Sequence, residues 1–445
     1  MDDQRVKVAI ERASANDLME RATDAGPAPM QVGAVLVLGP SERLSPEAMT
    51  DAVERRSRAI PRLRQVLVDA PFGCGRPFWT DDEDFAIEHH VRTVVCPAPG
   101  DEMALLAVAS DLLIERLPAN RPLWSITLVT GLADGGSALV TVFHHVLADG
   151  IGGLAVLAGL VDGAAEDLPV PAPSPRPHRT RLLFAATRTR LRAMTRLPAG
   201  LRQVRAAIAE FRRADTPKAA RTSLNRPTGP RRALAVARVD LAPVLDLAHA
   251  HAATVNDVLL TAVAGALQAT LARRGEVAVP EFVISVPVSG RRATGATELG
   301  NDVSVRPVAV PADGDPLDRL EETARRRPPR DEAPVNTAVV MDPALRLLAA
   351  LRLLHWLTDH QRMVNGFVTN LHGPDERLTF LGAEVREVIP VSGTAGNVTV
   401  AFAALSYAGT LVITLVADPE TCPDLPAVRD DLQSELEGLI ARSGG

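Results

Sequence analysis

The sequence predicts an α/β protein with two domains, and three observations carry this prediction. The chain has 445 residues, enough for two domains of about 200 residues each. Predicted strands and helices follow one another along it, most clearly over residues 138–160, where an apolar strand leads through a turn into a helix. The composition then changes to proline and arginine over 169–230. We therefore expect an N-terminal domain over 1–168, a linker over 169–230 and a C-terminal domain over 231–445.

The overall composition is typical of a soluble globular protein with an apolar interior or tunnel. Hydrophobic residues make up 46% of the chain, and its mean hydropathy is +0.07. The longest apolar stretch, Phe402 to Ala417, is interrupted by polar residues and predicts two strands joined at a turn rather than a membrane span. The charged first residues do not resemble a signal peptide, so we expect an intracellular protein. The cysteines, Cys74, Cys96 and Cys422, lack ligand spacing and predict neither disulfides nor a zinc site.

The N-terminal domain contains several predicted elements with clear ends. A short helix from about Asp17 precedes a strand over Val32–Leu38. The next helix begins after Ser45, whose hydroxyl can cap it, and it ends near Ile60 because Pro61 follows. Further expected elements are a strand over 85–95, a helix over 102–117 and a strand over 125–130.

The residues best suited to catalysis follow the predicted buried strand over 138–143. His144 and His145 come directly after it, and Asp149 and Gly150 lead into the next helix. A histidine at the end of a buried strand is held by the sheet while its ring faces a crevice. This is the geometry that a general base needs.

Two other interpretations of these histidines remain open: a core side chain without a chemical role, and a metal ligand. Neighbouring side chains on an extended strand point to opposite faces, so His144 and His145 cannot easily share one ion. A second pair, His89 and His90, lacks a following Asp-Gly, and we expect it to be structural.

The linker carries a strong positive charge. Residues 176–232 contain fifteen arginines and one lysine but only two acidic residues. Nucleic-acid binding is not favoured, because Phe184 and Phe211 are the only aromatic residues among these charges. Leucines lie among the arginines instead, which favours a basic amphipathic helix on an anionic membrane or lipid surface. The alternative is a solvated linker whose arginines pair with the acidic domains.

The C-terminal domain is predicted to continue the α/β pattern. A strand from about 233 is followed by two helices over 241–272, where Asn256 and Asp257 stand at a helix start and Thr254 or Asn256 can cap it. Further expected elements are strands over 282–291, 303–310 and 397–404, a helix over 344–360 and a final strand ending at Asp418.

The order His-His-x-x-x-Asp-Gly over 144–150 resembles the HHxxxDG motif of the CoA-dependent acyltransferase superfamily. Other stretches resemble one branch of it, the wax ester synthase/diacylglycerol acyltransferase family, in family order from about Asp17 to Asp418. They include PMQVG over 29–33, GRPFW over 75–79, PLW over 122–124, ND over 256–257, PVS-x-R over 287–291 and TN-x-x-GP over 369–374. The chain departs from the family at His372, and over 316–340, where RRRPPRDEAP interrupts an expected long helix.

The resemblance implies two chloramphenicol-acetyltransferase-like domains, each a mixed sheet flanked by helices, with an active-site tunnel at their interface. It implies that His145 is the general base that takes the proton of an alcohol as it attacks an acyl-CoA thioester. His144 and Asp149 complete the catalytic motif, with Asp149 holding the loop through an ion pair with Arg291. The resemblance also implies active-site support from Gly150, Arg291, Asn256, Asp257 and Trp124, and substrate binding by Ser289, Thr369, Asn370 and Ser392. For Asn256 and Asp257, a plain capping role explains the residues equally well.

The expected function is transfer of a long fatty acyl group from acyl-CoA to a diacylglycerol or long-chain alcohol. Acyl-CoA is then a co-substrate, and no cofactor, metal or nucleic acid is expected. The expected location is cytoplasmic, with peripheral contact to an anionic membrane or lipid inclusions. Two alternatives stay open: acylation of a polyketide, peptide or glycolipid hydroxyl, and a non-catalytic role on lipid inclusions.

Overall fold

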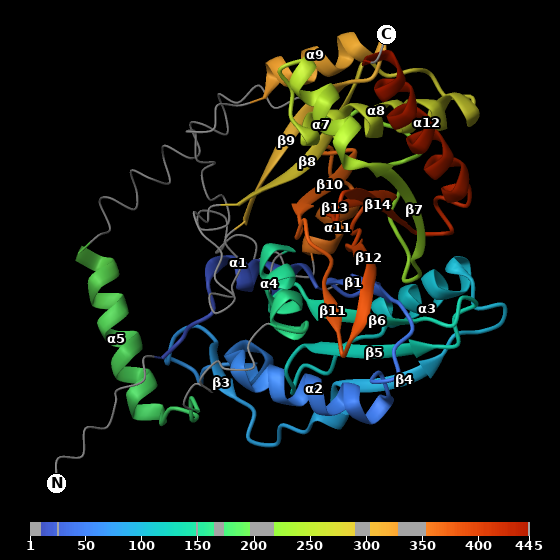
Figure 1. Cartoon of the computed structure of the whole chain (residues 1–445). Coiled ribbons are helices and arrows are strands. Elements are labelled where there is room, and N and C mark those ends of the chain that lie inside the picture. Colours follow the sequence, from blue (N-terminus) through green and yellow to red (C-terminus); the bar gives the residue numbers. More distant parts are fainter. Residues whose placement is uncertain are drawn as a thin grey trace.

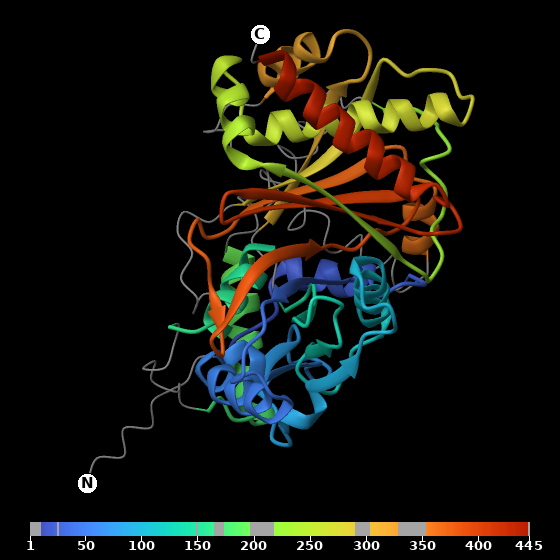
Figure 2. The same cartoon turned by 45° about the vertical axis from the view of Figure 1, so that its right-hand side comes forward.

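Two six-stranded sheets, one in each half of the molecule, organise the chain (Figures 1 and 2). The structure is a computed structural model that describes residues 10–24, 26–147, 150–163, 173–195, 218–289, 303–327 and 353–443. The first sheet has the order β11-β12-β1-β6-β5-β4 and the second β7-β14-β13-β10-β8-β9, and β2 pairs with β3 in a separate ribbon. Both large sheets mix parallel and antiparallel pairs, so the predicted α/β class with mixed sheets is confirmed.

The strands have the following bounds. In the first sheet they are β1 (Gln31–Leu38), β4 (Val91–Val95), β5 (Trp124–Thr130), β6 (Ser137–His144), β11 (Thr379–Phe380) and β12 (Ala383–Val391). In the second they are β7 (Ala233–Asp240), β8 (Glu281–Ser289), β9 (Val303–Pro311), β10 (Gly366–His372), β13 (Val400–Tyr407) and β14 (Thr410–Ala417). The ribbon consists of β2 (Gln65–Val68) and β3 (Phe78–Asp81).

The helices flank these sheets. They are α1 (Ala15–Thr23), α2 (Pro46–Ala59), α3 (Glu102–Ile114), α4 (Gly150–Leu160), α5 (Arg179–Thr195), α7 (Leu241–Ala250), α8 (Val255–Arg273), α9 (Pro316–Arg326), α11 (Leu353–Asp359) and α12 (Leu425–Ser443), with short 3-10 helices at Pro61–Arg64 and Ile87–His89. The strand expected over 85–95 is shorter than predicted, because the second 3-10 turn precedes β4. Residues 344–352 of the helix expected over 344–360 lie outside the described residues.

Side-chain caps fix where two of these helices begin. The Ser45 hydroxyl accepts the Ala48 N–H at 3.1 Å, as expected for the start of α2. Thr254 caps α8 in a capping box, in which Asp257 returns a hydrogen bond to the Thr254 N–H at 2.8 Å. Thr254 is therefore the capping residue, and Asp257 completes the box.

The C-terminal core is built around α8. Its buried leucines and valines pack between the second sheet and α12. Among the described helices, α8 alone is long and apolar enough to cross a membrane, but 72% of its apolar stretch is buried inside the protein. Burial in this core accounts for its composition.

The first sheet contains strands from both predicted domains, which was not expected from the sequence. β11 and β12 come from the range 231–445 but extend the first sheet, where β12 runs antiparallel to β1 with Gly33 opposite Val391. Figure 2 shows these orange strands reaching down from the C-terminal half. The last four residues of β12 are buried, so the strand contributes to the interior as well as to the sheet. The three predicted domain ranges stay a prediction, and β11 and β12 connect the first sheet to the C-terminal range.

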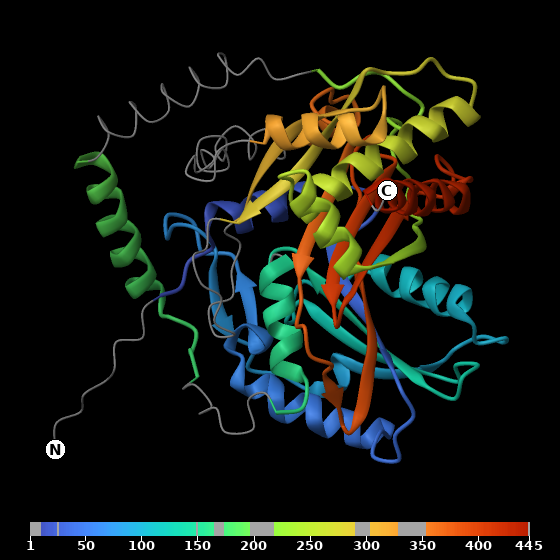
Figure 3. The same ribbon diagram turned by 45° about the horizontal axis from the view of Figure 1, so that its top comes forward.

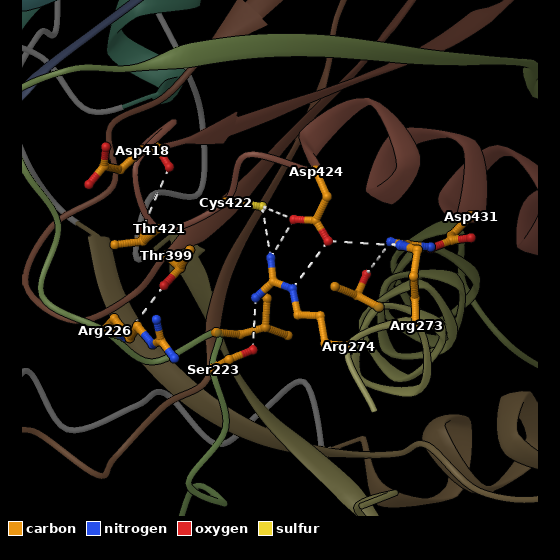
Figure 4. A network of polar contacts seen from close by, with 12 residues as sticks. Ser223, Arg226, Arg273, Arg274, Thr399, Asp418, Thr421, Cys422, Asp424 and Asp431 are labelled. Atoms are coloured by element: carbon orange, nitrogen blue, oxygen red, sulfur yellow. Dashed lines mark hydrogen bonds and ion pairs between the residues drawn. The ribbon is translucent and has the colours of Figure 1, made fainter. Parts of the chain in front are cut away.

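The end of the predicted linker is attached to the C-terminal domain by polar contacts (Figure 4). Arg274 donates hydrogen bonds to Asp424 at 3.1 Å and to the Ser223 hydroxyl at 2.8 Å. The Gly229 N–H donates to Asp418 at 2.7 Å. Cys422 lies in the same network, where burial raises the pKa of its thiol to about 12. Ser223 and Gly229, at the end of the predicted linker, therefore contact the C-terminal half directly.

Tyr407, the only tyrosine of the chain, connects the two sheets. It ends β13, and its hydroxyl donates to the Val385 carbonyl of β12 at 2.8 Å and accepts the Leu378 N–H at 2.7 Å. Its side chain is buried, and this burial raises the pKa of the phenol.

We expect this phenol to titrate at higher pH than in the unfolded chain. Absorbance of tyrosinate against pH should give one step above about pH 10 in the folded protein and near 10 in urea. The neutral phenol stabilises the fold below the unfolded pKa, and this contribution is lost as pH rises through the folded pKa. Tyr407→Phe should remove the step and lower the free energy of unfolding by about 1–3 kcal/mol, because two backbone groups lose their partner. A step at or below pH 10 in the folded protein would contradict this environment.

Candidate active site

A pocket of about 690 Å³, open to solvent, lies where the two sheets meet. Its walls come from β1 and α4 of the N-terminal half and from β10, β12 and β13. Three polar side chains line it, those of His145, Thr369 and Ser392, and the rest of its described lining is apolar or glycine. The predicted location of the site at the domain interface agrees with this pocket.

His145 is held in the lining of the pocket by the pairing of β1 with β6. This pairing runs from Leu38 opposite Ser137 to Gln31 opposite His144, and the His145 N–H continues it by donating to the Met30 carbonyl at 2.9 Å. The backbone of His145 is therefore fixed by the sheet, while its ring lines the pocket. Its Nδ1 atom lies 3.9 Å from Glu20 Oε2 of α1, inside ion-pair range but longer than a hydrogen bond.

His144 has a different environment from His145, as expected for neighbours on a strand. Its side chain is buried, its Nδ1 accepts the Val146 N–H at 3.0 Å, and its Nε2 lies 3.2 Å from Asp24 Oδ2. Because Nδ1 is the acceptor, Nε2 carries the proton and donates to the carboxylate. His144 thus stabilises the turn that presents His145. His144 itself is not among the residues lining the pocket.

Asp24 anchors this arrangement from the end of α1. Besides His144, it binds the Met30 N–H at 2.8 Å and Arg116 at 3.2 Å. Burial by itself would raise the pKa of Asp24, but the hydrogen bonds from His144 and Met30 and the charge of Arg116 lower it overall. The carboxylate is therefore ionised and joins β1, β6 and the segment after α3.

Gly33 lets β1 approach β6 closely beside this site. A Cβ atom at Gly33 would lie 1.9 Å from the Thr141 carbonyl oxygen, a distance that no side chain tolerates. Gly33 itself lines the pocket. The PMQVG stretch therefore supplies both the backbone partner of His145, at Met30, and the residue that allows the strands to pack.

The structure separates the predicted substrate-binding residues by the alternation of strand faces. Thr369 and Leu371 of β10 line the pocket, whereas Val368 lies in the C-terminal core. Asn370 shares the face of Val368 and is not among the residues lining the pocket. Ser392 and Gly150 also line it, and their predicted roles stay predictions. The side chain of Ser289 lies outside the described residues.

Trp124 is not among the residues lining the pocket and has a structural role. Its side chain is fully buried, its indole N–H donates to the Leu63 carbonyl at 2.7 Å, and its ring stacks on His90 with centroids 4.5 Å apart. The second histidine pair therefore belongs to the core through His90, in agreement with its predicted structural role. Trp124 supports the strand that pairs with β6.

Asn256 and Asp257 are not among the residues lining the pocket either. Asp257 serves the capping box of α8 and forms an ion pair with Arg327. Of the two interpretations of Asp257, the structure shows the capping role.

Asp149 and Arg291 lie outside the described residues, so their ion pair stays a prediction. The structure adds two carboxylates that the sequence analysis did not select, Glu20 and Asp24, together with Arg116. No motif marks these residues. The available signal was their position just before the strand that pairs with the histidine strand.

Comparisons with known proteins agree with the motifs. Residues 14–259 match the family model of the wax ester synthase/diacylglycerol acyltransferase catalytic domain, and residues 299–440 match that of the WS/DGAT C-terminal domain. The probable diacylglycerol O-acyltransferase tgs1 of Mycobacterium tuberculosis is 31% identical over 437 residues, which cover 93% of this chain and 92% of the relative. A putative diacylglycerol O-acyltransferase of Mycobacterium bovis is 28% identical over 454 residues, 95% of this chain and 97% of the relative.

Solved structures share the fold. The wax ester synthase/diacylglycerol acyltransferase from Marinobacter aquaeolei VT8 superposes with a TM-score of 0.69 and 22% identity, covering 98% of this chain and 100% of that chain. The first condensation domain of the calcium-dependent antibiotic synthetase, in complex with a substrate analogue, gives a TM-score of 0.62 and 19% identity over 98% and 97% of the two chains. The predicted acyltransferase-like fold is thereby confirmed.

Asp24→Asn should destabilise the turn that presents His145. At neutral pH we expect a loss of about 1.5–3 kcal/mol, because the hydrogen bond from His144 and the ion pair with Arg116 lose their charged partner. A free aspartate titrates near 3.9, so the stabilisation by Asp24 is complete above this pH and is lost as pH falls through the lower folded pKa.

The difference in unfolding free energy between wild type and Asp24→Asn, measured in urea, should therefore shrink only below about pH 4. Asp134→Asn is a matched control, since Asp134 pairs with Arg386 at an exposed site and should contribute less than about 1 kcal/mol. Equal effects of the two substitutions would show that Asp24 does not anchor the site.

Proposed function

The chain belongs to the wax ester synthase/diacylglycerol acyltransferase family, and from this premise we propose that it transfers a fatty acyl group from acyl-CoA to the hydroxyl of a diacylglycerol or long-chain alcohol. Membership of this family makes the chain an acyltransferase. What we propose beyond this is the class of acceptor, the fatty nature of the acyl chain and the role of His145.

One observation carries the proposal: a strand-anchored His145 faces an apolar pocket between two sheets. The apolar walls suit alkyl chains, which gain free energy from burial, and the polar side chains of the described lining are those of His145, Thr369 and Ser392. A hydroxyl and a thioester brought together there react in one ternary complex, without a covalent enzyme intermediate.

His145 acts in this mechanism as general base and then as general acid. Its Nε2 takes the proton of the acceptor hydroxyl while the hydroxyl oxygen attacks the thioester carbonyl carbon. When the C–S bond breaks, the same proton passes to the departing sulfur, so the products are an ester and free CoA. We assign Nε2 because Nδ1 is buried on the side of Glu20. Thr369 and Ser392 place hydroxyl groups in the same pocket, where they orient the reacting ester atoms by hydrogen bonds.

The basic helix α5 supports the proposal of a lipid substrate. It lies at the edge of the molecule, on the side of the N-terminal half (Figures 1 and 3). Leu182 and Ala186 are buried against the protein, whereas Leu183, Phe184 and Leu191 are 47%, 72% and 59% exposed. Exposed arginines, among them Arg179, Arg188 and Arg190, lie on the same helix. Apolar side chains and cations exposed together on one helix suit an anionic lipid surface.

Purified protein supplied with palmitoyl-CoA and either a diacylglycerol or hexadecanol should release free CoA and form the ester. His145→Ala should lower this rate by about a hundredfold to ten-thousandfold, which is the usual contribution of a positioned base. A thiol reagent measures CoA, and mass spectrometry identifies the ester.

His89→Ala is the matched control, because His89 is an exposed histidine away from the pocket. Equal CoA release by the wild type and the His145 variant would exclude His145 as the base. The same mass spectrometric assay with polyketide, peptide and glycolipid hydroxyls, and with carrier-bound acyl donors, would reveal a different acceptor class.

Binding to vesicles should depend on α5 and on anionic lipid. In co-sedimentation, the protein should bind phosphatidylserine-containing vesicles, bind less to neutral vesicles and dissociate as salt increases, since each arginine near an anionic surface contributes about 1 kcal/mol. Phe184→Ser and the pair Arg188→Gln with Arg190→Gln should each weaken binding. Arg43→Gln with Arg55→Gln, two exposed arginines elsewhere, is the control. Binding that is insensitive to salt and to the α5 substitutions would assign the helix to the linker alone.

A further inference from the structure

A second cavity lies deeper in the N-terminal half, beyond the catalytic pocket. It is small, with room for about one water-sized sphere, and is lined by α2, α4 and the strands of the first sheet. The side chain of Leu157 lines both the pocket that contains His145 and this inner cavity. Leu157 is therefore the one residue that the described linings of the two spaces share.

Residues of α4 line the pocket near the start of the helix and the inner cavity near its end. Gly150, Gly153 and Leu154 line the pocket, Leu157 lines both spaces, and Leu160 lines the inner cavity. These positions follow the three-and-four spacing of one helix face. At a rise of about 1.5 Å per residue, this face extends about 15 Å from the histidine end of α4 into the domain. Figure 3 shows α4 beside the orange strands that close the pocket.

The inner cavity suits an apolar occupant. Its described lining consists of aliphatic and aromatic side chains, except for Thr141. The Thr141 hydroxyl is already used, since it donates to the Ala34 carbonyl at 3.1 Å and accepts the Ala34 N–H at 3.2 Å. A cavity without available polar partners does not hold water well but accepts hydrocarbon.

We propose that Leu157 is a specificity-determining residue that sets the length of the alkyl chain bound along α4. The chain of a reactant starts at the thioester or hydroxyl beside His145, runs along the helix face, and ends against the Leu157 side chain. A smaller side chain at this position would join the volume that Leu157 now fills to the inner cavity behind it, and a longer chain would occupy the combined space. The inference rests on the proposed function, because it assumes that the pocket binds a fatty reactant.

The test is a comparison of kcat/KM for octanoyl-, palmitoyl-, stearoyl- and arachidoyl-CoA with one fixed acceptor. Leu157→Ala should shift the preferred chain to greater length, because each additional buried methylene group is worth about a fourfold gain in binding. Leu157→Phe should shift it to shorter chains. A parallel series of alcohols with fixed palmitoyl-CoA tells whether the chain along α4 belongs to the donor or to the acceptor. An unchanged preference in both series for both variants would overturn the inference.

Two further variants separate a specific effect from general damage to the core. Leu106→Ala removes a buried leucine from the core between the sheets, where it lines neither space, and should lower the melting temperature without altering the chain preference. Val53 lines only the inner cavity, so adding Val53→Met to Leu157→Ala should refill the space and return the preference toward that of wild type. If the wild type transfers no acyl group at all, the proposed function fails. If the wild type is active but both Leu157 variants keep its chain-length preference, only this inference fails.

Discussion

The antiparallel pairing of β1 with β6 is the constraint on which the candidate site depends. It runs without a break from Leu38 to Gln31, and Gly33 keeps the two backbones close where any side chain would separate them. At the end of the pairing, Met30 fixes the backbone of His145, and the segment before Met30 supplies the carboxylates that face both histidine rings. The position of the proposed base is thus set by backbone hydrogen bonds of a sheet rather than by a flexible loop, which gives a catalytic group its precision.

The pocket itself depends on the place of β12, a strand of the C-terminal range, in the first sheet. β12 pairs with β1 of the first sheet. β10, which contains Thr369, and β13 also line the pocket, but they belong to the second sheet. Tyr407 and the charged cluster in which Arg238 of β7 contacts Glu102 and Glu387 hold these parts together. Neither half of the chain supplies the described lining alone, so the shape of the pocket depends on contact between the halves.

Much of the fold could be predicted from local signals in the sequence. The cap at Ser45, the buried strand before His144 and the turn between β13 and β14 each follow from a few neighbouring residues, and the structure contains all three. Strand alternation also predicted that the two neighbouring histidines face opposite sides, and the family resemblance indicated His145 as the one in the site. The same alternation, applied to β10 with Val368 as the buried reference, would have separated Thr369 from Asn370.

What could not be predicted depends on contacts between distant parts of the chain. Asp24 and His144 are 120 positions apart, and their hydrogen bond leaves no pattern in a single sequence. The place of β12 in the first sheet is equally hidden, because an apolar strand carries no mark of the sheet it joins. The family resemblance supplied the role of His145 but not the second carboxylate, Glu20, that lies behind its ring.

The placement of β12 also affects the order in which this protein can fold during synthesis. β1 is an interior strand of the first sheet only after residues 383–391 have left the ribosome; until then one of its edges has no partner strand. Unpaired edges of apolar strands promote association between chains. The N-terminal half must therefore wait, through the synthesis of the linker and most of the C-terminal half, before its sheet is complete. In this protein β12 is synthesised late but completes a sheet whose other main strands are synthesised early. Premature termination of synthesis before β12 would leave one edge of β1 unpaired.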